Sequence, residues 1–337
     1  MLNKNKTFKN LYVFSILIIG IVIQFYGCAD KKKEATGWEQ VIASDGSNPI
    51  ARHEAAFVRV KDKFYLLGGR GIRPVSIYDI NTNAWTTGKE PPIEMHHFQP
   101  IVYKDKIYIF GAMSGKYPGE IPVSNIYWYD PLTDKWSQGD EIPEERRRGS
   151  SGNVLQGNKV FMSCGILDGH RGDHKKWLDS YDFETGVWEV LNDAPRARDH
   201  FQAVLVDGKI YNMAGRLSNA PDNTFNQTLS EVDVFDISEG KWKTLVTEIP
   251  TKRAGNTIIS KGKEIWIVGG ESVAQETAHS EVEILDTKTN TWIIGPPLLR
   301  GRHGTGIVNH EGSFYIASGC GNRGGRPELQ TMEKLTY

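Results

Sequence analysis

The sequence predicts an all-β protein, a six-bladed β-propeller whose four-stranded blades stand around a central channel, and two observations lead to this fold. The first is a phrase that recurs five times: a large apolar residue, then Asp, then five residues, then Trp. The second is its period, because successive Trp residues lie 51, 52, 54 and 50 positions apart. Strand-like repeats of this length are typical of radial β arrays. The phrases begin at Tyr78-Asp79, Tyr129-Asp130, Tyr181-Asp182, Phe235-Asp236 and Leu285-Asp286 and end at Trp85, Trp136, Trp188, Trp242 and Trp292.

Each repeat supplies the four strands of one blade. A short first strand follows a basic residue, and an apolar second strand rich in β-branched and aromatic residues ends in small residues. The third strand carries the Asp, and the fourth begins at the Trp. Turn residues lie between them, so we interpret the repeated Asp as a turn former and not as a catalyst. The expected second strands cover 63–69, 106–111, 159–165, 209–215, 263–270 and 313–319.

The repeat resembles the kelch motif over residues 38–335. The resemblance rests on the constant Asp-to-Trp spacing and on the pair of small residues that closes the second strand. That pair is Gly68-Gly69 in the first repeat and Gly269-Gly270 in the fifth, and at least one small residue occupies it in the others. Kelch repeats form four-stranded propeller blades, so the resemblance implies a scaffold whose activity depends on the site that its loops carry.

The sixth repeat lacks a fourth strand at its own end. Its second strand is expected at 314–319 and its third at 332–335, after which no Trp follows. A strand-like segment, Trp38-Glu39-Gln40-Val41, instead precedes the first repeat. We expect this N-terminal strand to complete the last blade and close the ring, which removes exposed sheet edges and makes 38–337 one domain.

The N-terminus has the composition of a secretory signal of the lipoprotein type. Lys4, Lys6 and Lys9 precede a 13-residue apolar run at 11–23, which is short for a transmembrane helix. Gly27 directly before Cys28 resembles a bacterial lipoprotein processing site. We therefore expect a signal peptide at 1–27, a lipidated Cys28, a tether at 28–37 and anchorage to a membrane of the bacterial cell envelope. An uncleaved anchor or an ordinary signal peptide is the alternative.

The other two cysteines, Cys164 and Cys320, end the second strands of the third and sixth blades. These blades face each other across a six-fold ring, so a disulfide between the two residues is geometrically implausible. We expect both to be small buried residues.

Two columns of polar residues are expected around the channel. The position 12 residues before the first apolar residue of each second strand is Arg in five repeats: Arg52, Arg148, Arg198, Arg253 and Arg302. The next two positions hold His53, His97, His200 and His303. The loop after the second strand lies on the same face and adds Arg216 and Arg323. Since the net charge is only −1, this cation cluster is local and favours a ligand that bears carboxylate, sulfate or phosphate.

Other interpretations of these residues stay open. The arginine column can instead bind loop carbonyls or acidic neighbours between blades, because ion-pair networks imitate sites. His170 and His174, with Asp168 and Asp173, offer metal ligands, but a solvated Gly-rich loop is the preferred interpretation, and we expect no metal. The sequence has no phosphate loop, dinucleotide fingerprint or Ser-His-Asp motif, so we expect no cofactor. Nucleic-acid binding is not expected of a near-neutral secreted chain.

Two functions follow from different classes. Secreted propellers of the kelch type include a sialic acid epimerase and resemble polyuronate lyases, which implies an enzyme acting on an acidic sugar. His200 and His303 are then the candidate bases and Tyr117 the candidate acid, while Arg198, Arg253 and Arg302 hold the anion. The alternative is a non-catalytic module that binds an anionic oligosaccharide or polysaccharide, or a protein partner, on the loop face. Galactose oxidase activity is not expected, because no copper-ligand set is evident.

Overall fold

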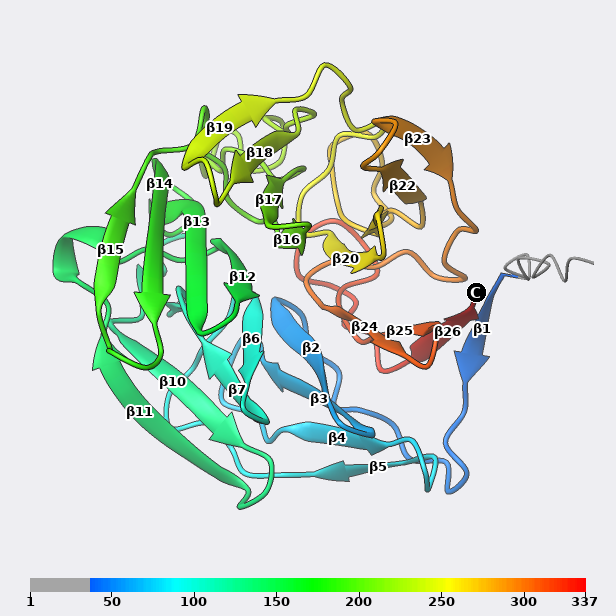
Figure 1. Ribbon diagram of the computed structural model, residues 1–337. Helices are drawn as coiled ribbons and strands as arrows, with labels where there is room; N and C mark the ends of the chain where they lie inside the picture. Colours follow the sequence, from blue (N-terminus) through cyan, green and yellow to red (C-terminus); the bar gives the residue numbers. More distant parts are fainter. Residues whose placement is uncertain (1–36) are drawn as a thin grey trace, which may run out of the picture. The chain divides into compact units, whose positions relative to one another are not determined.

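The computed structural model describes residues 37–337, which form six four-stranded antiparallel sheets arranged as blades around a channel (Figure 1). The first three blades are β2 (Ala55–Val60), β3 (Lys63–Gly68), β4 (Ser76–Asp79) and β5 (Ala84–Thr87); β6 (Pro100–Tyr103), β7 (Lys106–Ile109), β10 (Asn125–Asp130) and β11 (Lys135–Glu141); and β12 (Gly152–Gln156), β13 (Lys159–Asp168), β14 (Gly172–Asp182) and β15 (Trp188–Leu191). The fourth and fifth are β16 (Ala203–Val206), β17 (Lys209–Asn212), β18 (Asp233–Asp236) and β19 (Lys241–Thr244), then β20 (Thr257–Lys261), β21 (Glu264–Val268), β22 (Val282–Asp286) and β23 (Thr291–Ile294).

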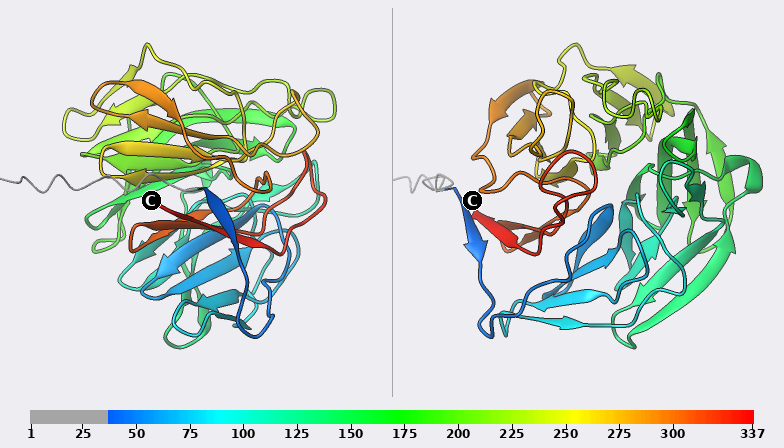
Figure 2. Two further views of the ribbon diagram at one scale, coloured as in Figure 1. Left: turned by 90° about the vertical axis from the view of Figure 1, so that its right-hand side faces the viewer. Right: turned by 180° about the vertical axis from the view of Figure 1, so that it is seen from behind.

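The sixth blade joins the two ends of the described chain. It consists of β24 (Ile307–His310), β25 (Ser313–Ala317), β26 (Met332–Thr336) and β1 (Trp38–Val41). β1 pairs with β26 in the register Trp38↔Leu335 and Val41↔Met332, and Figure 2 shows the two strands side by side. The prediction that the N-terminal strand closes the ring is therefore confirmed. The expected signal peptide at 1–27, Cys28 and all but the last residue of the tether lie outside the described residues.

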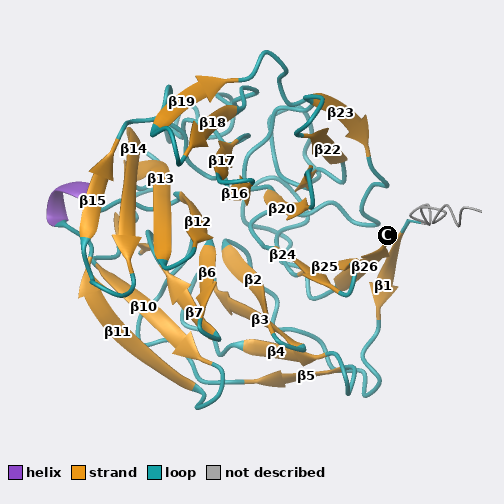
Figure 3. Cartoon of the chain, viewed as in Figure 1, coloured by secondary structure: helices purple, strands orange, loops and turns teal. Residues whose placement is uncertain are grey.

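Strands and loops dominate the ring (Figure 3), and the helical element of 37–337 is a single 3-10 turn, η1 (Glu144–Arg146). A two-stranded ribbon, β8 (Met113–Ser114) and β9 (Ile121–Pro122), forms within the long connection of the second blade. None of the helices in 37–337 is both long and apolar enough to span a bilayer.

The recurring Asp and Trp build the hairpin between the third and fourth strands. Each Asp accepts backbone N–H bonds from residues two or three positions later; the Asp79 carboxylate, for example, lies 2.9 Å from the Asn81 nitrogen. The corresponding bonds are Asp130 to Leu132, Asp182 to Glu184, Asp236 to Ser238 and Asp286 to Lys288. The preceding apolar residue then pairs across the hairpin with the Trp, as Tyr78 does with Trp85. The role of turn former is confirmed.

The core lies between blades, where apolar side chains of neighbouring sheets interdigitate. Phe64 of β3, for example, stacks on Tyr78 of its own blade at 5.7 Å and packs on Tyr315 of the sixth blade at 4.9 Å between ring centroids. The second strands are almost wholly buried, as their unbroken apolar sequences require. Cys164 and Cys320 are buried free thiols within this core, as predicted.

Candidate functional site

A pocket of about 910 Å³ opens on one face of the ring, at the mouth of the channel. The loops that follow the second strands of all six blades line it, together with the residues that precede β2. The shared face expected for these two kinds of segment is therefore confirmed. The side chains of the lining are His53, Glu54, Arg70, Arg73, Glu94, Lys116, Tyr117, His170, Arg216, Thr224, Phe225, Glu271, Arg326, Pro327 and Glu328.

Beneath the pocket, one residue of each blade adopts a left-handed backbone conformation, with φ between 51° and 64°. The six residues are Glu54, His97, Ser150, His200, Gly255 and Gly304. Backbone bonds link them around the channel, for example from His97 N–H to the Glu54 carbonyl at 3.0 Å and from Gly304 N–H to the Gly255 carbonyl at 2.8 Å. Residues other than Gly cost about 1–2 kcal/mol in this conformation, so the backbone is strained at the four positions of this ring that bear a side chain.

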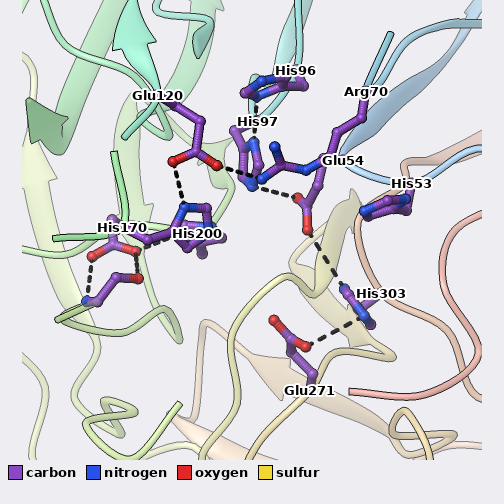
Figure 4. A network of polar contacts seen from close by, with 12 residues as sticks. His53, Glu54, Arg70, His96, His97, Glu120, His170, His200, Glu271 and His303 are labelled. Carbon is purple, nitrogen blue, oxygen red and sulfur yellow. Dashed lines mark hydrogen bonds and ion pairs between the residues drawn. The ribbon is translucent and has the colours of Figure 1, made fainter. Parts of the chain in front are cut away.

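A buried cluster of histidines and carboxylates fills the space between this ring and the pocket (Figure 4). His170 Nδ1 lies 3.0 Å from Glu120 Oε2, and Glu120 in turn pairs with Arg70 at 2.5 Å. His200 Nδ1 contacts Asp199 Oδ1, while its Nε2 lies 3.0 Å from His170 Nε2. His97 completes the cluster on its other side.

His97 contacts His96 through Nδ1 at 2.6 Å. Its Nε2 lies 3.3 Å from Glu54 Oε2 but has no hydrogen-bond partner. Burial lowers the pKa of His97 well below its usual value, and burial together with Arg216 lowers the pKa of His200 to about 4. Both shifts favour the neutral imidazole near pH 7.

His303 has the opposite electrostatic environment. It is buried with Nε2 3.3 Å from Glu271 and Nδ1 3.9 Å from Glu54. Burial opposes its charged form, but Glu271 and Glu54 prevail and raise the pKa of His303 to about 10. The raised pKa favours the protonated imidazole, which does not accept a proton, and His303 lies outside the residues that line the pocket. This environment disfavours the predicted role of His303 as a base and favours that of a buried cation.

The arginine column does not reach the pocket. Arg52, Arg148, Arg198, Arg253 and Arg302 are at most 1% exposed, and none of them lines it. Their guanidiniums bond carbonyls at the start of the third strand, as Arg52 does with Pro74 at 2.7 Å. In four blades they also pair with a buried carboxylate, as Arg253 does with Glu283 at 2.8 Å. The prediction that these five residues bind the ligand was wrong, because all five are buried away from the pocket and the architecture occupies most of their donors; the exceptions are the Nε atoms of Arg198 and Arg253, which have no partner.

The other predicted site residues divide between the pocket and its floor. Tyr117, His53 and Arg216 line the pocket, with Tyr117 about half exposed and Arg216 paired with Glu271 at 2.5 Å. His97 and His200 lie in the floor and line the narrow channel below it. Arg323 lies outside the lining, where its side chain donates to the carbonyls of Ser272, Val273 and Gln275.

Sequence reasoning missed the carboxylates that make the cluster, above all Glu54, Glu120 and Asp199. The loop with His170 and His174 was expected to be solvated; this holds for Asp168, Arg171 and Asp173, which are exposed, but was wrong for His170, which is buried. The hairpin of β13 and β14 reaches the pocket at His170, whose N–H donates to the Pro118 carbonyl. One signal was present for Glu54: its column contains Gly255 and Gly304, as a position with positive φ would.

A closed ring of six blades with these hairpins defines a β-propeller of the kelch type, a scaffold for binding or catalysis. The chain belongs to the attractin/LZTR1 β-propeller family, whose model matches residues 29–272, and a kelch motif model matches residues 252–299.

Known relatives and a solved structure resemble the chain over most of its length. Kelch-like protein terF of Aspergillus terreus is 26% identical over 80% of this chain and 61% of its own. Kelch-like protein 25 of Xenopus tropicalis is 23% identical over 72% of this chain and 41% of its own. The chain therefore spans less than two thirds of the length of either relative. The structure of YjhT matches with a TM-score of 0.70 and 14% identity, covering 84% of this chain and 95% of that one. At this identity the likeness concerns the fold alone.

Proposed function

We propose that the protein binds an acidic sugar in the pocket and acts on it by proton transfer, as a carbohydrate epimerase or a polysaccharide lyase does. The observation that carries the proposal is the combination of aromatic and cationic side chains around a cavity of about 910 Å³. Tyr117 and Phe225 offer apolar ring surfaces against which a sugar can pack. A cavity of this volume accommodates a small oligosaccharide.

The charges of the lining favour an anion. Each carboxylate of the pocket already has protein partners: Glu271 pairs with Arg216, Glu328 with Arg73, and Glu94 accepts the N–H groups of Gly71 and Gly115. Glu54 lies between His97 and His303. Lys116 and Arg326 are exposed at the rim, so the net attraction is for a negatively charged ligand.

Two groups of the lining suit proton transfer. His53 Nδ1 lies 2.7 Å from Glu328 Oε1, a carboxylate–imidazole pair of the kind that orients a general base. The Tyr117 hydroxyl lies 3.1 Å from Thr224 Oγ1, and its ring lies 5.0 Å from that of His170. In the proposed reaction His53 removes the proton beside the sugar carboxylate. Tyr117 donates a proton either to the same carbon or to the leaving glycosidic oxygen.

The predictions about the N-terminus stay predictions. A signal peptide, lipidation of Cys28 and anchorage to the bacterial envelope would place the pocket where it meets extracytoplasmic glycans. Labelling of the expressed full-length chain with a lipid precursor, compared with a Cys28→Ala variant, tests them directly.

Binding is tested by calorimetry with uronate-containing, sialylated and neutral oligosaccharides. We expect saturable binding of the anionic ligands alone, weakened by salt. Lys116→Gln and Arg326→Gln each weaken it about 3- to 10-fold, since rim charges contribute about 1 kcal/mol. Lys288→Gln, in the exposed turn between β22 and β23, is the matched control and leaves binding unchanged. Equal affinity for neutral ligands, or none for any ligand, contradicts the proposal.

Turnover separates an enzyme from a binding module. Products are followed by mass spectrometry, by the absorbance of unsaturated uronates and by NMR of the epimerised carbon. We expect His53→Gln and Tyr117→Phe to lower kcat by at least 100-fold with little change in KM, because proton transfer contributes about 100- to 10,000-fold to the rate. Saturable binding without turnover by the unmodified protein would establish the non-catalytic module instead.

A further inference from the structure

Three histidines from three consecutive blades meet at the floor of the pocket. His97 precedes β6, His170 lies in the hairpin between β13 and β14, and His200 precedes β16. One ring nitrogen from each lies within 4.8 Å of those of the other two, and all three residues are buried. Their ring centroids are 4.6–5.1 Å apart, so no other side chain fits between them.

Hydrogen bonds at the far side of each ring fix which nitrogen faces the centre. His170 Nδ1 and His200 Nδ1 both face carboxylates, of Glu120 and Asp199, and must therefore carry the hydrogen that is donated. In a neutral imidazole the other nitrogen then bears a lone pair. The two Nε2 atoms thus direct lone pairs at each other across 3.0 Å, a contact that needs a cation between them.

The protonated nitrogen of His97 can be assigned in the same way, from the hydrogen bonds of its neighbour His96. The Gly115 carbonyl, 3.2 Å from His96 Nε2, can only accept, so that nitrogen donates and His96 Nδ1 is an acceptor. His97 Nδ1, 2.6 Å away, must then be the donor, which leaves a lone pair on His97 Nε2. This nitrogen is the buried atom that has no hydrogen-bond partner. Each of the three buried imidazoles of the cluster is therefore left with a lone pair on Nε2.

The surroundings match those of a metal centre. Histidine ligands of metals typically donate their second N–H to a carboxylate or carbonyl, as His170 does to Glu120 and His200 to Asp199, whereas His97 donates to His96. Asp199 is itself held by Ser218, whose N–H and hydroxyl lie 2.9 Å and 2.7 Å from its carboxylate oxygens. Around tetrahedral zinc, nitrogens bound at about 2.0–2.1 Å lie about 3.3 Å apart, close to the His170–His200 spacing.

We propose that His97, His170 and His200 bind a divalent transition-metal ion of the zinc class through their Nε2 atoms. Three imidazoles leave one coordination position open, as in catalytic zinc sites. Glu54 lies beside that position, and Glu54 and His170 both line the pocket. An ion there can bind the carboxylate or hydroxyl oxygens of a ligand in the pocket; this role, unlike the metal site itself, rests on the proposed function.

Zinc binding by the full-length chain tests the site. After treatment with a chelator, the protein is titrated with Zn²⁺ by calorimetry and with Co²⁺ by visible absorption. We expect one equivalent of Zn²⁺ to bind and the Co²⁺ spectrum to be that of a four- or five-coordinate nitrogen site. His170→Ala weakens Zn²⁺ binding at least 100-fold, and the positioning variants Glu120→Gln and Asp199→Asn weaken it about 10- to 100-fold.

Matched variants guard against loss of the fold. His97→Gly and His200→Gly remove a ligand but place Gly at a positive φ, where it is unstrained, so the protein stays folded while zinc binding is lost. His310→Ala, on β24 of the sixth blade, is the control and binds Zn²⁺ normally. Circular dichroism verifies the fold of each variant.

The proposal is overturned if the unmodified protein binds no stoichiometric Zn²⁺, or if folded ligand variants bind it as tightly. A shared proton between His170 and His200, seen as a strongly deshielded NMR resonance in protein that binds no Zn²⁺, would also overturn it. The two proposals can fail separately. Sugar binding without zinc binding refutes only the metal site, and zinc binding without sugar binding refutes only the proposed binding of an acidic sugar.

Discussion

Two rings of polar side chains surround the channel at positions only two residues apart in each repeat, and they behave differently. In the arginine column, five guanidiniums are buried and bonded to third-strand carbonyls or carboxylates of the ring. In the neighbouring ring, Glu54, His97 and His200 have strained backbones, and the buried His97 Nε2 has no hydrogen-bond partner. The arginines lie outside the lining of the pocket and serve the architecture, whereas Glu54, His97 and His200 line the pocket or the channel below it under backbone strain.

We expect the largest change in stability from substitutions in the arginine column. Arg253→Met leaves the carboxylate of Glu283 buried with Thr251 as its remaining side-chain partner, so we expect a loss of about 3–5 kcal/mol in the free energy of unfolding. Arg52→Met leaves only carbonyls and the Ser76 hydroxyl without their partner. We therefore expect a smaller loss in the free energy of unfolding, about 1–3 kcal/mol. Urea denaturation measures both, and equal losses would contradict the structural role of the ion pair.

The pH dependence of stability separates a buried cation from a base. The pKa of His303 is raised to about 10 in the folded state, so the stability it contributes is complete below its ordinary value of 6.5 and is lost as the pH rises through 10. We expect His303→Gln to abolish this alkaline loss in urea melts recorded between pH 6 and 10.5. If the variant loses as much stability at alkaline pH as the unmodified protein does, His303 is neutral in the folded protein.

The dependence of stability on pH below pH 5 tests the pair of His53 and Glu328. Burial opposes ionisation of Glu328, but its bonds with His53 and Arg73 lower its pKa to about 2. The stability from this carboxylate is therefore complete above pH 4.5 and is lost as the pH falls towards 2. Glu328→Gln should reduce this loss of stability in melts between pH 2 and 5, and an identical acid profile would argue against the pair.

The smallest effect concerns backbone strain in the second ring. Ser150 has a φ of 53° and a buried hydroxyl without a partner, so Ser150→Gly should raise the free energy of unfolding by about 0.5–1 kcal/mol. Its neighbour Ser151 contacts Asn153 at 3.2 Å and has no positive φ, so Ser151→Gly should be destabilising. Chemical denaturation compares them, and a loss of stability in both would refute strain as the distinguishing feature.

The fold was predictable because it depends on local signals that repeat. The Asp and Trp fix a hairpin within one repeat, and the segment 38–41 was the strand that the sixth blade lacked. The site was less predictable, because it depends on contacts between blades. The position of His170 follows from bonds with Pro118 and Ala220 in the neighbouring loops, which no local pattern reveals. The structural role of the arginines could have been predicted from the sequence. Their partners Asp179, Asp233 and Glu283 each lie at the same position of the repeat, three residues before the turn Asp.

The most direct test of the contrast between the two rings is anomalous diffraction at the zinc edge from crystals grown with Zn²⁺. A single strong peak among the Nε2 atoms of His97, His170 and His200, with every arginine of the other column still bonded to its own blade, is the predicted result. If the crystals show this fold but the map has no peak there, the claim that the three histidines form a metal centre is contradicted.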